Sequence, residues 1–232
     1  MPVFYTPDIA VQACLPPEEA AHCIKVLRLK TGDEIRLADG KGHFYRARIS
    51  RAEVKNCEVE ILEVLPQVSD SIGLHLAVAP TKNADRMEWM AEKLTEIGID
   101  SLSFVRSSHS ERKQLKTDRI SKIAVAAMKQ SERSVLPEIR EMVDFEQWIQ
   151  RDFEGQKFIA HCWPEDEKPF IKEVYCPGKP VLLLIGPEGD FSREEVALAK
   201  SLGFKSISLG NIRLRTETAA FFAATVVRLA NM

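Results

Sequence analysis

The sequence predicts an α/β protein in which a small β-rich module precedes a larger domain built around a parallel sheet. Up to residue 65, short runs alternate apolar and polar residues, which is typical of strands with one solvent-facing side. From Gly73 onward, apolar runs without alternation are separated by helical patterns, as in a sheet covered on both faces. The stretch 66–71 between them is polar and turn-prone. We therefore expect domains at residues 1–68 and 69–232, joined by this linker.

The first domain is expected to be a compact, barrel-like β module with one helix. Pro16 and Pro17 followed by two acidic residues fit the first turn of a helix, which we expect to run to Leu29. Glycines at 40 and 42 stand between two alternating runs, which is the pattern of a hairpin with a glycine-bearing loop. Strands are expected at residues 34–39, 43–50 and 57–65.

The second domain is expected to alternate strands with helices. Asn83 is a candidate cap for a helix with apolar residues at helical spacing, and Gly98 is its candidate stop. Apolar strands joined by helices argue for a largely parallel sheet, in which ligands usually bind outside the carboxyl ends of the strands. Strands are expected at residues 73–80, 101–107, 157–162, 181–187 and 205–210.

Composition limits the class of protein. The chain has 232 residues, of which 45% are hydrophobic and 28% are charged, and no run approaches the roughly 20 apolar residues of a membrane span. The amino terminus has no basic segment followed by an apolar run, so secretion is not expected. Five cysteines without a C-x-x-C pair predict neither a disulfide framework nor a metal site. We expect a soluble cytoplasmic protein with reduced thiols.

The net charge of −2 hides a basic segment. Residues 106–140 hold nine Lys or Arg against four Asp or Glu, a net +5, so the rest of the chain carries −7. A helix over residues 118–134 places four of these cations within an arc of about 80°. Such a face suits contacts to a polyanion such as RNA, and a solvated helix surface is the alternative. The four residues are Arg119, Lys122, Lys129 and Arg133.

The stretch VLLLIGPEGDFS, at residues 181–192, predicts a loop at the end of a buried strand. Gly186 and Gly189 permit unusual dihedral angles and close backbone approach, and Ser192 with Glu195 forms a capping box for the next helix. The loop is neither G-x-G-x-x-G nor a Walker A sequence, so dinucleotide and nucleoside triphosphate sites lack their phosphate cradle. From these local features alone, an ordinary strand-to-helix turn and a ligand-binding loop are equally good interpretations of this stretch.

A second glycine loop favours the ligand loop. The strand at 205–210 leads into LGNIRLRTETA, at residues 209–219, so two glycine-terminated loops are expected at one sheet edge. Together, IGPEG and LGNIRLRTETA resemble the paired signature of the RsmE family of SPOUT methyltransferases. Residues 22–49 are similar to the PUA-like module of that family, MEWMAEKLTEIGI to its first long helix, and KQSERSVLP, with Gln130 and Arg133, to a further motif.

The resemblance implies a fold and an activity. It implies a carboxyl-terminal SPOUT α/β domain with a trefoil knot, a PUA-like RNA-binding β-barrel, S-adenosylmethionine (SAM) bound by the knot loops, and a homodimer. It also implies methylation of N3 of a uridine in 16S ribosomal RNA of the small subunit. The cofactor residues carried over are Leu184, Ile185, Gly186, Pro187, Glu188, Gly189, Leu209, Gly210 and Leu214. The RNA-binding residues proposed are Arg28, Arg112, Lys113, Arg119, Lys122, Lys129 and Arg133.

Two departures from the family pattern affect the transfer of residue roles. Asp190 stands where the family often has glycine, and Asp tolerates left-handed turn geometry. The second loop carries an arginine at 213, where the family commonly has one at the position before it. Arg215 and Glu217 are therefore carried over in preference to Arg213.

The expected chemistry gives these two residues roles. Uridine N3 must lose a proton as it attacks the methyl group, so a cation or a base nearby assists. Arg215 is the candidate cation or phosphate clamp, and Glu217 is the candidate base or an orienting partner. A salt bridge at a helix start is the structural alternative for the pair.

Two further features of the sequence have simpler interpretations. His161 and Cys162 are adjacent on a strand, so they point to opposite faces and form no catalytic pair. The last helix is apolar around most of its circumference, which predicts burial in a core or a subunit contact.

Three hypotheses from different classes follow. The first is a SAM-dependent 16S rRNA uridine N3 methyltransferase. The second is a SPOUT methyltransferase acting on a different RNA. The third is a nonenzymatic RNA-binding assembly factor, which tight cofactor binding without methyl transfer to any RNA would favour.

Overall fold

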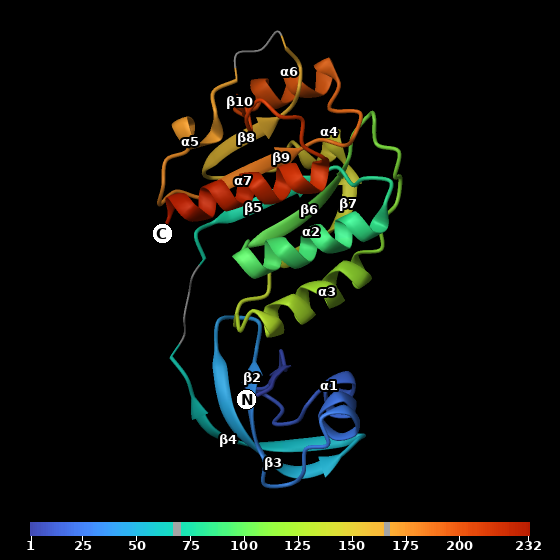
Figure 1. The fold of residues 1–232 in the computed structure, drawn as a ribbon, viewed down its shortest axis with the longest axis vertical. Helices are drawn as coiled ribbons and strands as arrows, with labels where there is room; N and C mark the ends of the chain where they lie inside the picture. Colours follow the sequence, from blue (N-terminus) through green and yellow to red (C-terminus); the bar gives the residue numbers. More distant parts are fainter. Residues whose placement is uncertain (67–70, 165–167) are drawn as a thin grey trace. The chain divides into compact units, whose positions relative to one another are not determined.

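The computed structural model describes residues 1–66, 71–164 and 168–232, which form two compact units (Figure 1). The first unit comprises Met1–Asp70 with Val125–Leu136, and the second comprises Ser71–Ala124 with Pro137–Met232. The expected boundary between residues 68 and 69 lies outside the described residues, as does most of the expected linker.

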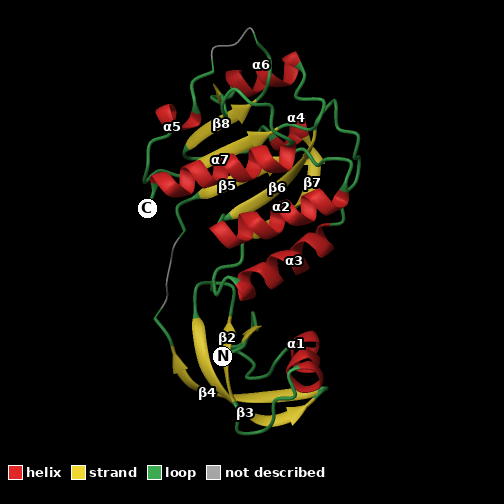
Figure 2. Ribbon diagram, viewed as in Figure 1, coloured by secondary structure: helices red, strands yellow, loops and turns green. Residues whose placement is uncertain are grey.

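The first unit is built on a four-stranded sheet in the order β1-β2-β3-β4 (Figure 2). The central strands β2 (Glu34–Ala38), β3 (Phe44–Glu53) and β4 (Asn56–Val64) pair antiparallel, and β1 (Val3–Tyr5) pairs parallel to β2. The three expected strands and their glycine hairpin are confirmed. Strand β1 was not expected, because three residues carry too little pattern and this strand exists only through its pairing with β2.

The helix of the first unit is shorter than expected. It consists of α1 (Pro17–Ala21) continued by a π-helical turn, η1 (His22–Val26), and Arg28 then adopts a left-handed φ of 55°. The expectation that the helix runs to Leu29 is wrong by three residues. The amide of Leu29 instead donates to the Cys23 carbonyl, which closes the helix end.

The core of the first unit contains two thiols. Cys23 and Cys57 are fully buried among aliphatic residues of the sheet. Burial, followed by the neighbouring Cys57 thiol, raises the pKa of Cys23 to about 12. The thiolate form that would react is therefore scarce at neutral pH. All five cysteines are free.

The second unit is built on a six-stranded sheet in which every pairing is parallel. All five expected strands are present, and β7 was not expected. Strand β7 could not be recognised from its sequence, because an edge strand with no fully buried residue has little apolar pattern. In spatial order, the strands are β10 (Lys205–Ile207), β8 (Gln156–Ala160), β9 (Val181–Ile185), β5 (Leu74–Val78), β6 (Ser101–Arg106) and β7 (Glu138–Asp144).

Helices cover both faces of this sheet, as the unbroken apolar strands predict. One core contains Leu183 of β9 and residues of three helices: α2 (Ala84–Ile97), α5 (Ile171–Val174) and α7 (Thr216–Ala230). In Figure 1, α2 and α7 run across the near side of the sheet. Helices α4 (Phe145–Trp148) and α6 (Arg193–Ser201) share the opposite core with Leu182 and Leu184.

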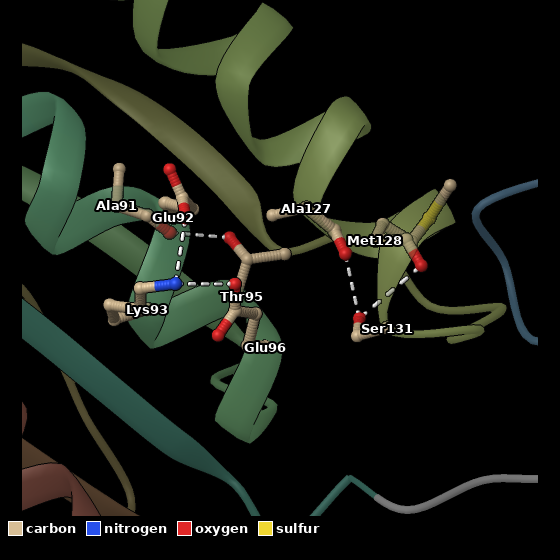
Figure 3. A network of polar contacts seen from close by, with 8 residues as sticks. All are labelled: Ala91, Glu92, Lys93, Thr95, Glu96, Ala127, Met128 and Ser131. Carbon is tan, nitrogen blue, oxygen red and sulfur yellow. Dashed lines mark hydrogen bonds and ion pairs between the residues drawn. The ribbon is translucent and has the colours of Figure 1, made fainter.

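The ends of α2 and α6 follow the expected signals. The Asn83 side chain accepts the Asp85 amide at 2.8 Å, Gly98 ends α2 with φ 86°, and Ser192 with Glu195 forms the capping box of α6. Within α2, Lys93 Nζ lies 2.7 Å from Glu92 Oε1 and 2.8 Å from Glu96 Oε1 (Figure 3). The Asn83 and Ser192 caps fix the starts of α2 and α6, which follow the loops after β5 and β9, and Gly98 fixes the end of α2 before β6.

Helix α3 (Thr117–Gln130) ends before the expected limit at residue 134. Beyond it, the Ser131 hydroxyl donates back to the Ala127 carbonyl at 2.7 Å (Figure 3), and Glu132 adopts a left-handed φ of 52°. Arg133 therefore follows the helix and does not share its basic face, so this part of the expectation is wrong. Within residues 1–66, 71–164 and 168–232, no helix is long and apolar enough to cross a membrane.

Replacing Leu183 tests the packing of the second unit. Leu183 is completely buried at the centre of β9, so Leu183→Ala should lower the free energy of unfolding by about 2–5 kcal/mol. All three tryptophans lie in this unit, so urea unfolding followed by tryptophan fluorescence measures it. Ile212→Ala, at an 81% exposed residue of the same unit, is the control. Equal losses in the two variants would contradict this packing.

Candidate active site

A cavity of about 840 Å³ opens at the carboxyl ends of β8, β9 and β10. Parallel strands end at one edge of a sheet, so the segments that follow them meet there. The cavity is lined by three such segments: Ala160–Pro164 after β8, Gly186–Asp190 after β9, and Ser208–Thr216 after β10. Its size is within the usual range of small-molecule sites.

The loop after β9 can approach its neighbours only because it contains glycines. A Cβ on Gly186 would lie 3.1 Å from the Phe191 ring, and a Cβ on Gly189 would lie 3.0 Å from Cβ of His109. Any larger residue would push one of these packed groups away. The Thr216 hydroxyl donates to the Gly186 carbonyl at 2.9 Å, which joins this loop to the start of α7.

The segment after β8 forms the third wall of the cavity. The Trp163 indole N–H donates to the Phe191 carbonyl at 2.9 Å, and the Arg193 guanidinium carbon lies 4.7 Å from the Trp163 ring centre. Cys162 lines the cavity, and burial, followed by the nearby Asp190 carboxylate, raises the pKa of its thiol. His161 Nε2 lies 2.9 Å from Ser206 Oγ.

The cofactor residues expected from the sequence gather at this cavity, with one exception. Leu184 lies outside it, because alternate residues of β9 face opposite sides and Leu184 is buried against α4 and α6. The contact of the others with a cofactor stays a prediction. Those that line the cavity are Ile185, Gly186, Pro187, Glu188, Gly189, Leu209, Gly210 and Leu214.

The two candidate catalytic residues are placed differently. Arg215 is exposed at the cap of α7 and lines the cavity, and its side chain makes no hydrogen bond or ion pair within the described parts of the chain. Glu217 is buried and does not line the cavity. Its Oε1 lies 3.6 Å from Arg86 Nε of α2, and its Oε2 has no hydrogen-bond partner among the described residues. The geometry thus favours the salt-bridge alternative for Glu217, with Arg86 in place of Arg215.

A network of hydrogen bonds ties the loop after β9 to the loop after β6. Glu195 is buried, and its two carboxylate oxygens each accept a backbone N–H at 2.8 Å, one from Ser192 and one from Ser108. His109 Nδ1 lies 3.1 Å from the carbonyl oxygens of both Gly189 and Asp190, so the ring N–H donates to them. These bonds restrain the loop that forms one wall of the cavity.

The candidate RNA-binding residues of the second unit differ in availability. Arg112 is used within the fold, since its guanidinium donates to the carbonyls of Thr81 and Lys82 at 2.9 and 2.5 Å. Arg119 is exposed and pairs with Glu88 at 2.5 Å. Lys113 and Lys122 are exposed. Lys113 and Lys122 therefore fit a phosphate-binding surface better than Arg112 does.

The candidate RNA-binding residues of the first unit also differ in how exposed their side chains are. Lys129 pairs with Glu19 at 2.6 Å, and both side chains are largely buried, so Lys129 does not present its ammonium group as the helix pattern predicted. Arg28 is exposed, and Arg133 is half-buried. Among the residues described, no three His, Cys, Asp or Glu side chains are grouped to hold a metal ion.

Sequence reasoning missed several residues that line the cavity. His161 and Cys162 were expected on opposite faces of a strand at 157–162, but β8 ends at Ala160 and both residues line the cavity, so that expectation is wrong. With Trp163 they follow the carboxyl end of β8, where ligands usually bind, and that rule could have found them. Asp190 and Thr216 also line the cavity. They are next to expected loop residues in the sequence, and this position could have identified them.

The fold and the cavity define an α/β protein that holds a ligand among loops at the carboxyl ends of parallel strands. Residues 69–228 match the family model described as RNA methyltransferase domain, and residues 15–62 match the model described as RNA methyltransferase PUA domain. The chain belongs to the RNA methyltransferase family. The expected amino-terminal PUA-like domain followed by an α/β RNA methyltransferase domain is confirmed, and the SPOUT type with its trefoil knot stays a prediction.

Known proteins are similar along the whole chain. A crystal structure of a probable rRNA methyltransferase from Porphyromonas gingivalis is 41% identical, with a TM-score of 0.92 over 100% of this chain and 98% of that one. Ribosomal RNA small subunit methyltransferase E from Neisseria gonorrhoeae, solved bound to S-adenosyl methionine, is 26% identical, with a TM-score of 0.86 over 100% and 98% of the two chains. The Rickettsia conorii protein of the same name is 29% identical over 93% of this chain and 88% of its own.

Replacing Glu195 tests the link between the two loops. Glu195→Gln leaves one acceptor oxygen for two backbone donors, so the Ser108 amide should exchange with solvent roughly tenfold faster, because a lost hydrogen bond of this kind is worth about 1–1.5 kcal/mol. Hydrogen exchange of the folded protein measures it.

Ser192→Ala is the matched control for this test. It removes the cap to the Glu195 amide at 3.2 Å and keeps both carboxylate bonds. Equal acceleration of the Ser108 amide in both variants would show that helix capping alone controls this loop.

Proposed function

We propose that this protein transfers a methyl group from SAM to N3 of a uridine in the 16S rRNA of the small ribosomal subunit. The observation that carries the proposal is the cavity formed by the two glycine loops, Gly186–Asp190 and Ser208–Thr216, in a chain of the RNA methyltransferase family. The similar protein from Neisseria gonorrhoeae is named for the small-subunit rRNA and was solved with SAM. Specificity for N3 of uridine rests on the resemblance to the RsmE family.

The cavity fits such a cofactor. Its wall combines the peptide groups of Gly186, Gly189 and Gly210 with the apolar side chains of Ile185 and Leu209, and this mixture suits a ligand with a purine ring and polar ends. At Gly210 the left-handed φ of 107° excludes a side chain, and nothing lies within 4 Å of the Cβ position, so the backbone there is open to a ligand. When bound, SAM supplies a methyl group on a sulfonium leaving group.

Arg215 is the residue of this chain best placed to assist the reaction. Uridine N3 carries a proton at neutral pH, and negative charge develops on the ring oxygens as the proton leaves and the N3–methyl bond forms. The exposed Arg215 guanidinium at the cavity edge stabilises that charge, and it can equally hold an RNA phosphate. Arg213 is a second exposed cation of the same loop.

Glu217 has an orienting role in this proposal. It is separated from the cavity and lies against Arg86 at 3.6 Å, so it fixes the first turn of α7 to α2. Arg215 is the N-cap residue of that turn, so the orientation of the Arg215 side chain depends on the position of the turn. Removal of the N3 proton is assigned to water or to an RNA group.

RNA is held by exposed cations in this proposal. Lys113 and Lys122 in the second unit and Arg28 in the first are exposed, and phosphate contacts position RNA without reading its sequence. N3 is on the Watson–Crick edge, so the target uridine must be unpaired or flipped out to reach the cavity. We place the boundary of the RNA-binding and methyltransferase domains at residues 68 and 69.

We further propose that the protein is a cytoplasmic homodimer. Helix α7 exposes large apolar side chains, including Phe222 at 37% and Leu229 at 63%, and exposed Trp89 of α2 lies 5.8 Å from the Phe221 ring. Apolar side chains gathered on two adjacent helices are typical of a subunit contact. Sedimentation velocity should give twice the mass of one chain, and Leu229→Glu should shift the protein toward monomer. A monomeric wild-type protein would refute the dimer.

Methyl transfer to small ribosomal subunits tests the function. With labelled SAM and subunits that lack the modification, we expect N3-methyluridine in the digested 16S rRNA. Arg215→Ala should lower kcat by about 10²-fold, as loss of a charge-stabilising donor does, with SAM affinity little changed.

Arg213→Ala, at the neighbouring exposed arginine, is the control and should cost less. If the labelled methyl group were found in another RNA, that RNA would be the substrate in place of 16S rRNA. SAM binding without transfer to any RNA would favour the nonenzymatic assembly factor.

A further inference from the structure

Asp190 has a backbone conformation that ordinarily belongs to glycine. Its φ is 64°, and the only other non-glycine residues with positive φ in the described parts of the chain are Arg28 and Glu132. For a residue with a side chain, this conformation is strained, although Asp and Asn tolerate it best. The cost must be offset by interactions of the side chain.

The Asp190 carboxylate supplies these interactions. Its Oδ1 accepts the Phe191 amide at 2.8 Å, and its Oδ2 accepts the Cys162 amide at 2.7 Å. A Cβ on Gly186 would lie 3.4 Å from Oδ1, so the carboxylate sits within the curve of the Gly186–Asp190 loop. Asp190 therefore joins the wall after β9 to the wall after β8, on either side of the cavity.

The charges around Asp190 come from several segments. Arg213 from the segment after β10 and Lys168 from the segment after β8 both act on Cys162, where they oppose the effect of Asp190. His109, from the loop after β6, holds the Asp190 carbonyl at 3.1 Å. Glu188, the other carboxylate lining the cavity, is exposed and screened by water, whereas Asp190 is half-buried.

Because Asp190 is partly buried, water screens its charge less than it screens an exposed charge. Cys162 lines the cavity beside Asp190, and the pKa of its thiol is raised by burial and then by this carboxylate. A charge within the wall acts on charges inside the cavity more strongly than an exposed one does. Asp190 thus places one negative charge in this wall, while the cations Lys168, Arg213 and Arg215 also line the cavity.

We propose that Asp190 is a positioning residue that fixes two walls of the cavity and whose charge shifts the binding preference of the cavity toward SAM and away from S-adenosylhomocysteine. The inference rests on the proposed function. Methyl transfer breaks the bond between sulfur and the methyl carbon and leaves a neutral thioether, so the product has one positive charge fewer than SAM. The Asp190 carboxylate attracts the sulfonium form more strongly than the neutral thioether, which favours release of the product.

Titration calorimetry of both ligands tests the proposal. Asn tolerates the same backbone conformation and keeps one acceptor oxygen, so Asp190→Asn removes the charge and one of the two amide bonds. The lost bond weakens both ligands alike, so the ratio of the two affinities reports the charge. The ratio of SAM to S-adenosylhomocysteine affinity should fall by about three- to tenfold, the size expected of one charge acting through a partly screened wall. Asp190→Gly relieves the backbone and leaves two amides unpaired, so both affinities should fall as well as the ratio.

Asp152→Asn is the matched control, because it removes one exposed carboxylate in the segment after α4. Its affinity ratio should equal that of the wild type. Tryptophan fluorescence and circular dichroism establish that each variant is folded.

Two results would overturn the inference in distinguishable ways. Equal losses of both affinities in Asp190→Asn, with the ratio unchanged, would show that Asp190 is a structural clasp alone. A wild-type protein that binds neither ligand would overturn the proposed function itself.

Discussion

The direction of the strands is the constraint on which the site depends. Because β8, β9 and β10 are parallel, their carboxyl ends lie at one edge, and the three segments that line the cavity meet there. The apolar strand β9 holds this arrangement, since Leu183 packs under α2 and α7 while Leu184 packs under α4 and α6. Hydrophobic burial on both faces thus fixes the position of loops that have little packing of their own.

The loops are held to one another mainly through backbone groups. The Thr216 hydroxyl binds the Gly186 carbonyl, the Glu195 carboxylate binds two amides, and the Asp190 carboxylate binds two more. Side chains thereby take up the donors and acceptors that loops leave unpaired. The carbonyls of Gly186 and Gly189 and both backbone groups of Gly210 take part in such bonds. Among the described residues, the Arg215 side chain has no hydrogen bond or ion pair, and it lines the cavity.

The first unit shows how a PUA-like domain can include residues from far along the chain. Residues 125–136 belong to it, and the Leu136 amide donates to the Gly40 carbonyl at 2.9 Å, while Lys129 pairs with Glu19. A cation that a helical wheel assigns to an RNA-binding face therefore has a structural partner. The exposed Arg28, Lys113 and Lys122 are better candidates for phosphate contacts.

The sequence by itself determined the strands of both units except β1 and β7, the caps at Asn83, Gly98 and Ser192, and the two glycine loops that line the cavity. These features depend on local propensity and apolar periodicity, which are properties of short segments. Only the tertiary structure decided that Leu184 faces away from the cavity, that Glu217 pairs with Arg86, and that Asp190 joins two walls. Each of these depends on groups from distant segments, and the spacing of residues along one segment contains no information about them.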